Sequence, residues 1–202
     1  MPAPRRKNNR EDINLPMPRH EDCWAKTTKD AQGREVPGIN VRDHCLNVGC
    51  VAEALLNLLP QQLRNLLPSN PATLASLHDI GKVSPGFQKK CPDWLVRYPL
   101  PHGIHEEDHA KISQFTIGEI LGASPLYQWA AIVGAHHGRL KGRLEPAPWE
   151  DERRRLAAEL IAHFGRLPDQ PGEDAVLWFT AGLISVADWI GSDENHFPQE
   201  TN

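Results

Sequence analysis

Apolar residues recur at helical spacing along most of the chain. The pattern predicts helices at about residues 43–59, 71–81, 87–96, 108–121, 125–136, 149–164 and 173–190. Asp43 is expected to cap the first helix, and Pro60 is expected to end it. No segment alternates convincingly between apolar and polar residues, as a half-buried strand would. The pattern therefore predicts an all-α fold without internal repeats.

The last predicted helix is apolar on nearly every side between Val176 and Ile190. A helix of this kind is expected at the centre of a fold. We find no run of about 18 apolar residues, so we expect no membrane span and no membrane partner.

The hydrophobic pattern also divides the chain. Prolines and glycines interrupt residues 1–40, and we expect residues 1–21 to be a flexible N-terminal segment. Residues 22–195 are expected to form a single globular domain, and residues 196–202 a tail or the start of a linker. The 202 residues suit one domain of this size.

Composition narrows the functional classes. The chain has 22 Lys and Arg against 26 Asp and Glu, and its formal net charge is -4. This argues against a general nucleic-acid coat but leaves a local basic groove open. The N-terminus lacks the apolar stretch of a secretory signal, and the four cysteines contain no C-x-x-C pair. We expect reduced thiols and a cytoplasmic protein.

Ten histidines are the unusual feature of the composition. Asp188 lies in the most apolar helix, where an unpaired carboxylate would cost several kcal/mol or more, in order-of-magnitude terms, so a cation must meet it. Similar polar groups end or open other apolar runs, namely His44, His78-Asp79, His109 and His136-His137.

Each of these features is weak alone. A single helical histidine is more often an ordinary core or surface residue, and Asp188 alone could cap a neighbouring helix. Together the residues lie on five predicted helices, which favours a shared metal site. Imidazole and carboxylate donors suit Mn, Fe, Co, Ni or Zn, and the absence of cysteine donors disfavours structural zinc.

At these residues the chain resembles the HD metal-dependent phosphohydrolase superfamily, and more closely the HD nuclease domain of the CRISPR-associated type I helicase–nuclease. The resemblance covers residues 22–192. It rests on the order H…HD…H…HH…D and on the segments Trp24-Ala25-Lys26, Leu77–Lys82 with Phe87-Gln88, His136-His137-Gly138 and Ser185–Gly191.

The resemblance implies an all-α HD-domain bundle with a di-metal site at its centre. One ion would be held by His44, His78, Asp79 and Asp188. The other would be held by His109, His136 and His137, with Asp79 bridging. His109 is preferred over His102 and His105, which lie in a Pro- and Gly-containing loop. The expected cofactors are two divalent ions, Mn, Fe, Co or Ni, with Mg or Zn as alternatives.

The activity implied is metal-dependent hydrolysis of single-stranded DNA, as endonuclease or exonuclease, in the antiviral defence of a type I CRISPR system. A water activated by the two ions would attack the phosphorus. Asp79 and Lys82 are the expected catalytic residues, with Lys82 neutralising a phosphate oxygen. Lys82 could equally be a solvated lysine at a helix C-terminus.

Basic residues flank both histidine motifs and could hold a DNA strand: Lys82, Lys89, Lys90, Arg139, Lys141 and Arg143. No G-x-x-x-x-G-K-[ST] loop is present, so no ATP site is expected here. A helicase domain or subunit and an RNA-guided surveillance complex are the expected partners. Two alternatives stay open, namely an HD phosphohydrolase acting on nucleotides or cyclic dinucleotides, and a non-catalytic interaction module.

Overall fold

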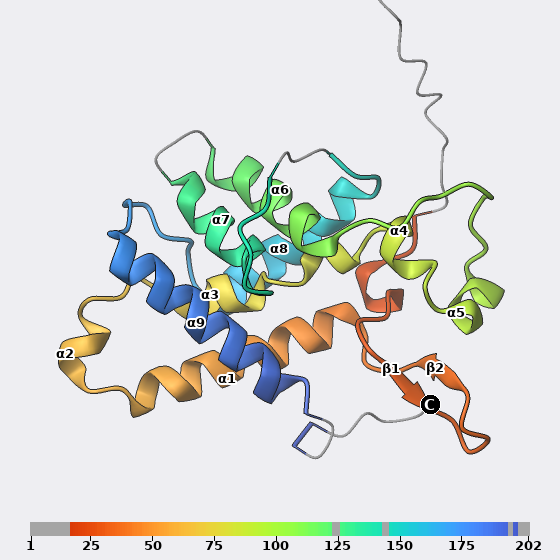
Figure 1. Cartoon of the computed structure of the whole chain (residues 1–202), viewed down its shortest axis with the longest axis horizontal. Helices are drawn as coiled ribbons and strands as arrows, with labels where there is room; N and C mark the ends of the chain where they lie inside the picture. Colours follow the sequence, from red (N-terminus) through yellow and green to blue (C-terminus); the bar gives the residue numbers. More distant parts are fainter. Residues whose placement is uncertain (1–16, 123–125, 143–145, 194–195, 198–202) are drawn as a thin grey trace, which may run out of the picture.

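The computed structural model describes residues 17–122, 126–142, 146–193 and 196–197. In this part of the chain helices dominate, with one two-stranded sheet, which confirms the all-α prediction. Figure 1 shows α1 and α9 crossing one side of the molecule, and α6, α7 and α8 on the other, with short segments between them. The expected flexible segment lies mostly outside the described residues. Its last five residues are described, and His20 among them is buried.

The helix α1 (Val41–Leu58) begins two residues before the predicted N-cap. Asn40 is the cap, and its side chain accepts a hydrogen bond from the backbone N–H of Asp43. The helix ends before Pro60, as expected, and the short α2 (Gln61–Arg64) follows. One face of α1 is buried, and it carries His44 into the interior.

The HD motif lies in a turn rather than inside a helix. α3 (Pro71–Ser76) ends before His78, and a 3-10 turn, η2 (Ile80–Lys82), follows Asp79. The single helix expected at 87–96 is in fact two, α4 (Pro85–Gln88) and α5 (Pro92–Arg97). Pro92 starts the second, because proline suits the first turn of a helix and not its interior.

Four longer helices complete the bundle. They are α6 (His109–Leu121), α7 (Tyr127–Gly134), α8 (Glu150–Phe164) and α9 (Asp174–Gly191). The Asp108 side chain caps α6 by accepting from the backbone N–H of Ala110. α6 packs on α7 and on η2, and α9 packs on α1, α3 and α7. This packing sets the five chain segments that carry the singled-out histidines and aspartates around one point.

α9 is not central, contrary to the expectation from its composition. Its inner face is buried, but its outer face leaves large apolar side chains exposed, including Trp178 at 60% and Trp189 at 72%. By length and composition alone this helix could cross a membrane. Core helices of soluble proteins satisfy the same test, and α9 packs on three other helices, so the evidence for a span is weak.

Two local features were not expected from the sequence. β1 (Thr27–Lys29) pairs antiparallel with β2 (Glu35–Pro37), across a turn in which Asp30 Oδ1 accepts from the backbone N–H groups of Gln32 and Arg34. Arg153, the first of three consecutive arginines in α8, is fully buried. Its guanidinium donates to the carbonyls of Val83, Ala147 and Pro148, to Thr116 Oγ1 and to the Glu150 carboxylate.

Candidate metal centre

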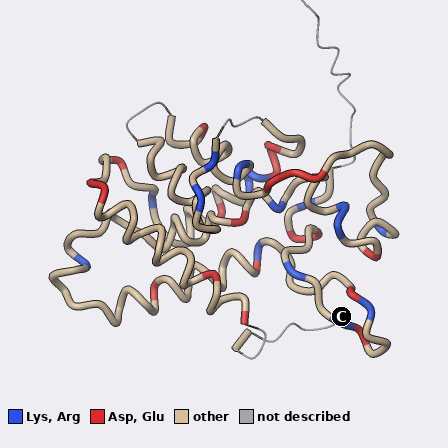
Figure 2. Tube along the Cα trace, viewed as in Figure 1, with Lys and Arg blue, Asp and Glu red and all other residues tan. Residues whose placement is uncertain are grey.

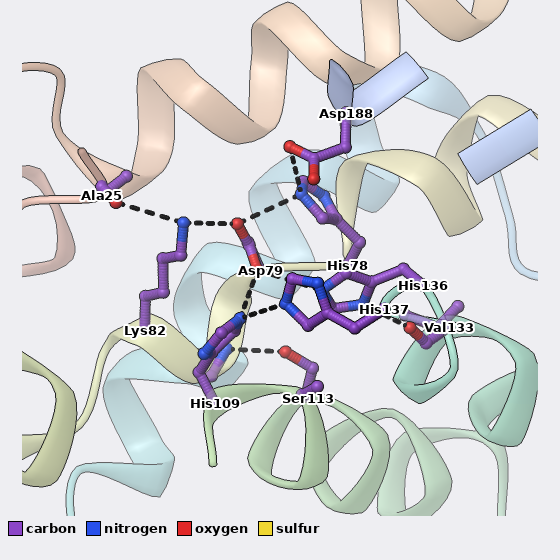
Figure 3. Close-up of polar contacts among 12 residues, drawn as sticks. Ala25, His78, Asp79, Lys82, His109, Ser113, Val133, His136, His137 and Asp188 are labelled. Carbon is purple, nitrogen blue, oxygen red and sulfur yellow. Dashed lines mark hydrogen bonds and ion pairs between the residues drawn. The ribbon is translucent and has the colours of Figure 1, made fainter. Parts of the chain in front are cut away.

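The structure brings all seven histidines and aspartates singled out from the sequence to one place. Figure 3 shows the HD pair, His109, the two adjacent histidines and Asp188. His44 comes from α1, the HD pair from the turn after α3, and His109 from the first residue of α6. The two adjacent histidines follow α7, and Asp188 comes from the last turn of α9. The side chains fall into two groups, each with ligand atoms within 4.8 Å of one another.

The first group contains His44, His78 and Asp79, which are buried, and Asp188, which is partly buried. Asp79 Oδ2 lies 3.0 Å from His44 Nε2 and 3.2 Å from His78 Nε2. Asp188 Oδ1 lies 3.5 Å from His44 Nε2 and 3.3 Å from His78 Nε2. Two imidazole nitrogens and two carboxylate oxygens therefore converge on one point.

The second group contains His109, His136 and His137 and opens toward the surface. The Nε2 atoms of His109 and His137 are 3.1 Å apart. Asp79 also faces this group, because its Oδ1 lies 3.2 Å from His109 Nε2 and 3.5 Å from His136 Nε2. The two oxygens of Asp79 thus point to different groups.

The hydrogen bonds of two buried rings fix which nitrogen is free. His78 Nδ1 lies 2.8 Å from the Ala75 carbonyl, and His136 Nδ1 lies 2.7 Å from the Val133 carbonyl. A carbonyl only accepts, so both Nδ1 atoms carry a proton and each Nε2 is the atom directed at the carboxylates. This orientation by a carbonyl behind the ring is common for metal-ligating histidines.

Several atoms at the centre lack the partner that a buried polar atom needs. Among the described residues, His78 Nε2, His136 Nε2 and Asp79 Oδ1 are buried and make no hydrogen bond. Where such a ring is neutral, its Nε2 presents a lone pair to a carboxylate, and the two acceptors repel unless a proton or a metal cation lies between them. The residues present therefore fit divalent metal ions in both donor type and orientation.

The electrostatics of the first group show how strongly its charges interact. Burial lowers the pKa of His78, but Asp79 and Asp188 outweigh this effect and raise the pKa to about 9. Burial would raise the pKa of Asp188, but the contact with His78 and the charge of that ring hold it below its usual range. The pKa of Asp79 is likewise held well below its usual range, against the effect of burial, by His78 and Lys82.

Two other imidazole rings of the centre have a lowered pKa. Burial lowers the pKa of His44 to about 4. Burial, followed by the neighbouring His136 and His109, lowers the pKa of His137 to about 4. Both rings are therefore neutral near pH 7, which is the form that binds a metal ion.

Lys82 lies inside the centre rather than at its mouth. Its side chain is buried, with Nζ 2.6 Å from Asp79 Oδ2 and 3.1 Å from the Ala25 carbonyl. Figure 3 shows the ammonium between these two partners. In this arrangement the Lys82 ammonium is not available to bind a DNA strand at the surface, which is the role expected for it from the sequence.

The other basic residues expected to bind DNA differ in their surroundings. Lys89 donates to the Ile104 carbonyl, Lys90 lies 3.9 Å from Glu106, and Lys141 pairs with Asp108 at 3.0 Å. Arg139 is exposed, and Arg143 lies outside the described residues. Figure 2 shows acidic and basic residues interspersed along the chain trace. The acidic residues at 106–108 thus partner two of these lysines.

The structure adds residues that sequence reasoning did not assign. The backbone N–H of Gly81 donates to Ser113 Oγ at 2.9 Å, and this bond joins the HD turn to α6. Gln88, named above only as part of a motif, is buried beside the centre.

A third group of possible metal ligands, His20 with Glu21 and Glu152, lies apart from the other two. There Glu152 Oε1 accepts from the backbone N–H of His20 and lies 2.7 Å from its Nδ1, which ties the first described residues to α8. His102 and His105 belong to none of the groups found in the described part of the chain.

Comparisons with known proteins point to a single family. Residues 24–197 match the family model described as Cas3, HD domain. The CRISPR-associated endonuclease/helicase Cas3 of Thermus thermophilus is 32% identical over 193 residues, which cover 77% of this chain and 21% of the relative. The chain thus spans about a fifth of that protein's length.

Solved structures agree with the sequence match. The crystal structure of T. fusca Cas3 with ATP aligns with a TM-score of 0.69 and 26% identity, over 89% of this chain and 23% of that one. The HD domain of T. thermophilus Cas3, crystallised in the presence of Ni²⁺, aligns with a TM-score of 0.62 and 27% identity, over 88% and 79%.

Proposed function

The chain belongs to the Cas3 HD-domain family, and we propose that it is a metal-dependent nuclease of CRISPR interference that hydrolyses single-stranded DNA at a two-ion centre. The family membership confirms the resemblance inferred from the sequence. The observation that carries the two-ion proposal is the position of Asp79, which presents Oδ2 to one ligand group and Oδ1 to the other.

In this proposal His44, His78, Asp79 and Asp188 hold the first ion, and His109, His136 and His137 hold the second. The donor set favours Mn, Fe, Co or Ni over Mg and structural zinc. The Ni²⁺ used with the related HD domain supports a transition metal. Once bound, the ions would activate the attacking water and offset the charge that develops on the phosphate.

The burial of the ligand residues indicates the side from which the substrate would approach. The first group is the more enclosed of the two, since His44 and His78 are fully buried and the Asp188 side chain is 13% exposed. The second group includes the exposed His137, so the scissile phosphate is expected to approach from the side of His109 and His137. Asp79 orients both groups, and the Ala75 and Val133 carbonyls hold two rings with their Nε2 atoms inward.

We propose that the DNA strand follows the exposed positions beside this opening. Arg139 follows the two adjacent histidines directly, and Lys141 could exchange Asp108 for a phosphate, since the pair lies partly exposed. The helicase function named for the longer relative would come from a helicase domain or subunit, and an RNA-guided surveillance complex would deliver the strand in the cytoplasm.

The test uses circular single-stranded DNA, because contaminating exonucleases cannot attack a circle. The metal-free chain is incubated with Mn²⁺ or Ni²⁺, with and without a chelator. We expect metal-dependent linearisation, its loss in Asp79→Asn, and its retention in the control Asp151→Asn, an exposed residue of α8. Cleavage by folded Asp79→Asn equal to that by the unmodified chain would refute the site.

The same preparation distinguishes the alternatives. Cleavage of linear strands only would identify an exonuclease. Hydrolysis of nucleotides or cyclic dinucleotides without DNA cleavage would favour the phosphohydrolase. An absence of any hydrolysis by metal-loaded protein would favour the interaction module.

A further inference from the structure

Gln88 uses its side-chain amide to join two segments that lie far apart in the sequence. This residue of α4 is fully buried. Its Oε1 accepts from the backbone N–H of Trp24 at 3.0 Å, and its Nε2 donates to the Trp24 carbonyl at 2.9 Å. The same Nε2 donates to the Lys82 carbonyl at 2.9 Å. The amide therefore pairs with Trp24 as a neighbouring strand would, and holds it to the HD turn.

The indole of Trp24 strengthens this attachment. Its Nε1–H donates to the Gln88 carbonyl at 3.1 Å, and its ring lies 4.7 Å from the Phe87 ring. On the far side, the backbone N–H of Ala25 donates to the Ile39 carbonyl at 2.8 Å. The segment at Trp24 and Ala25 is thus fixed from both sides, and the direction of the Ala25 carbonyl is fixed with it.

The Ala25 carbonyl is a partner of the buried Lys82 ammonium. Lys82 Nζ donates to this oxygen at 3.1 Å and contacts Asp79 Oδ2 at 2.6 Å (Figure 3). The Phe87 ring lies 5.4 Å from the same ammonium. A buried ammonium held at two points cannot swing away, so it fixes the rotation of the Asp79 carboxylate.

The rotation of the Asp79 carboxylate decides which ligand group each of its two oxygens faces. With Oδ2 held beside Lys82, Oδ2 faces His44 and His78 while Oδ1 faces His109. We propose that Gln88 is a positioning residue of the metal centre, which acts through the Ala25 carbonyl and Lys82 on Asp79. This inference rests on the proposed metal-binding function and assigns Lys82 to orientation of Asp79 rather than to DNA.

The chemistry of the site requires an amide at position 88. Two carbonyl oxygens lie 2.9 Å from Nε2, so the side chain must donate twice while its other end accepts once. Methionine has a similar shape but no N–H donor, and glutamate retains only the acceptor when it is ionised. Both substitutions leave the volume nearly unchanged and remove the two donated bonds.

The experiment compares Gln88→Met, Lys82→Met and the double variant with the full unmodified chain. Gln61→Met is the matched control, because Gln61 is exposed and makes a single side-chain bond to Asn65. The readouts are the affinity for Ni²⁺ by calorimetry, the visible absorption of bound Co²⁺, and the melting temperature of metal-free protein. Circular dichroism checks that each variant is helical.

We expect Gln88→Met to weaken Ni²⁺ binding about 10- to 100-fold, the range seen when residues behind metal ligands are changed, and to alter the Co²⁺ spectrum. Lys82→Met should do the same, and the double variant should bind no more weakly than Lys82→Met alone, because both residues act along one route. Gln61→Met should bind like the unmodified chain. Gln88→Glu carries the test if the methionine variant fails to fold.

Two results would overturn the inference. The first is a lower melting temperature of Gln88→Met with unchanged Ni²⁺ affinity and Co²⁺ spectrum, which would make Gln88 a purely structural clamp. The second is full additivity in the double variant. Neither is confused with failure of the proposed function, in which the unmodified chain itself would bind neither ion.

Discussion

Metal binding by this chain is expected to release a proton from His78. The ring donates from Nδ1 to the Ala75 carbonyl, and its Nε2 lies between Asp79 and Asp188 at 3.2 and 3.3 Å. Although burial lowers the pKa of this ring, the two carboxylates raise it to about 9, so the metal-free ring is protonated at pH 7. An ion can take Nε2 only after this proton has left.

The size of the effect follows from the pKa. A pH of 7 lies about two units below the His78 pKa of about 9, so roughly one His78 ring in 100 is neutral. The affinity for the first ion should then be roughly 100-fold weaker at pH 7 than at its plateau above pH 9, or about 2.7 kcal/mol. The sign is fixed, because a raised pKa favours the protonated, metal-free state, and the affinity rises about tenfold per pH unit toward 9. His44 and His137, with pKa values of about 4, are already neutral and release no proton.

The measurement is calorimetric titration of the chelator-treated chain with Ni²⁺ at pH 7.5, in two buffers of different ionisation enthalpy. The difference in heat gives the number of protons released, which we expect to be about one for the first ion. His102→Gln, in an exposed loop, is the matched control and should release the same number. An affinity that does not change between pH 6.5 and 8.5, with no proton released, would refute the assignment of His78 as a ligand.

Three further predictions concern the scaffold of the site. Arg153→Met leaves several buried acceptors without a donor, so the melting temperature should fall by roughly 6–12 °C, for a loss of about 3 kcal/mol. The control is Arg154→Met, at a side chain that is 41% exposed, and it should shift the melting temperature measured by calorimetry by no more than about 2 °C. Equal shifts for the two variants would contradict a stabilising role of the buried Arg153 network. Gly81→Ala places a Cβ against the His109 carbonyl, so α6 must move and the Ni²⁺ stoichiometry measured by elemental analysis should drop. Unchanged stoichiometry would show that this turn does not position His109. Trp189→Ser, on the exposed face of α9, should change the free energy of unfolding in urea by no more than about 0.5 kcal/mol, and a loss of several kcal/mol would mean that the side chain is packed.

Much of the centre could be predicted from the sequence because its residues lie at special places in the hydrophobic pattern. The HD pair and the two adjacent histidines each follow an apolar run, and Asp188 lies inside one. Such positions are buried once the helix packs, and buried polar groups need partners. The same pattern predicted the helix α6, because helix periodicity is a local property.

Other features depend on segments distant in sequence. The three-residue strand β1 has no periodic signal and exists through its pairing with β2. The burial of Arg153 depends on acceptors from the turn after η2, from α6 and from the loop before α8. The apolar composition of α9 does not reveal that one face packs on three helices while the other stays exposed.

The sequence alone therefore indicated which residues are the candidate donors, and the tertiary structure decided how their side chains are oriented. Residue types and local periodicity specify which donors enter the interior. Only the packing of α1, α6 and α9 around the HD turn decides that Asp79 faces both groups and that Lys82 points inward to it. Contacts between distant segments decide this orientation, because a side chain's partners are set by where the backbones meet.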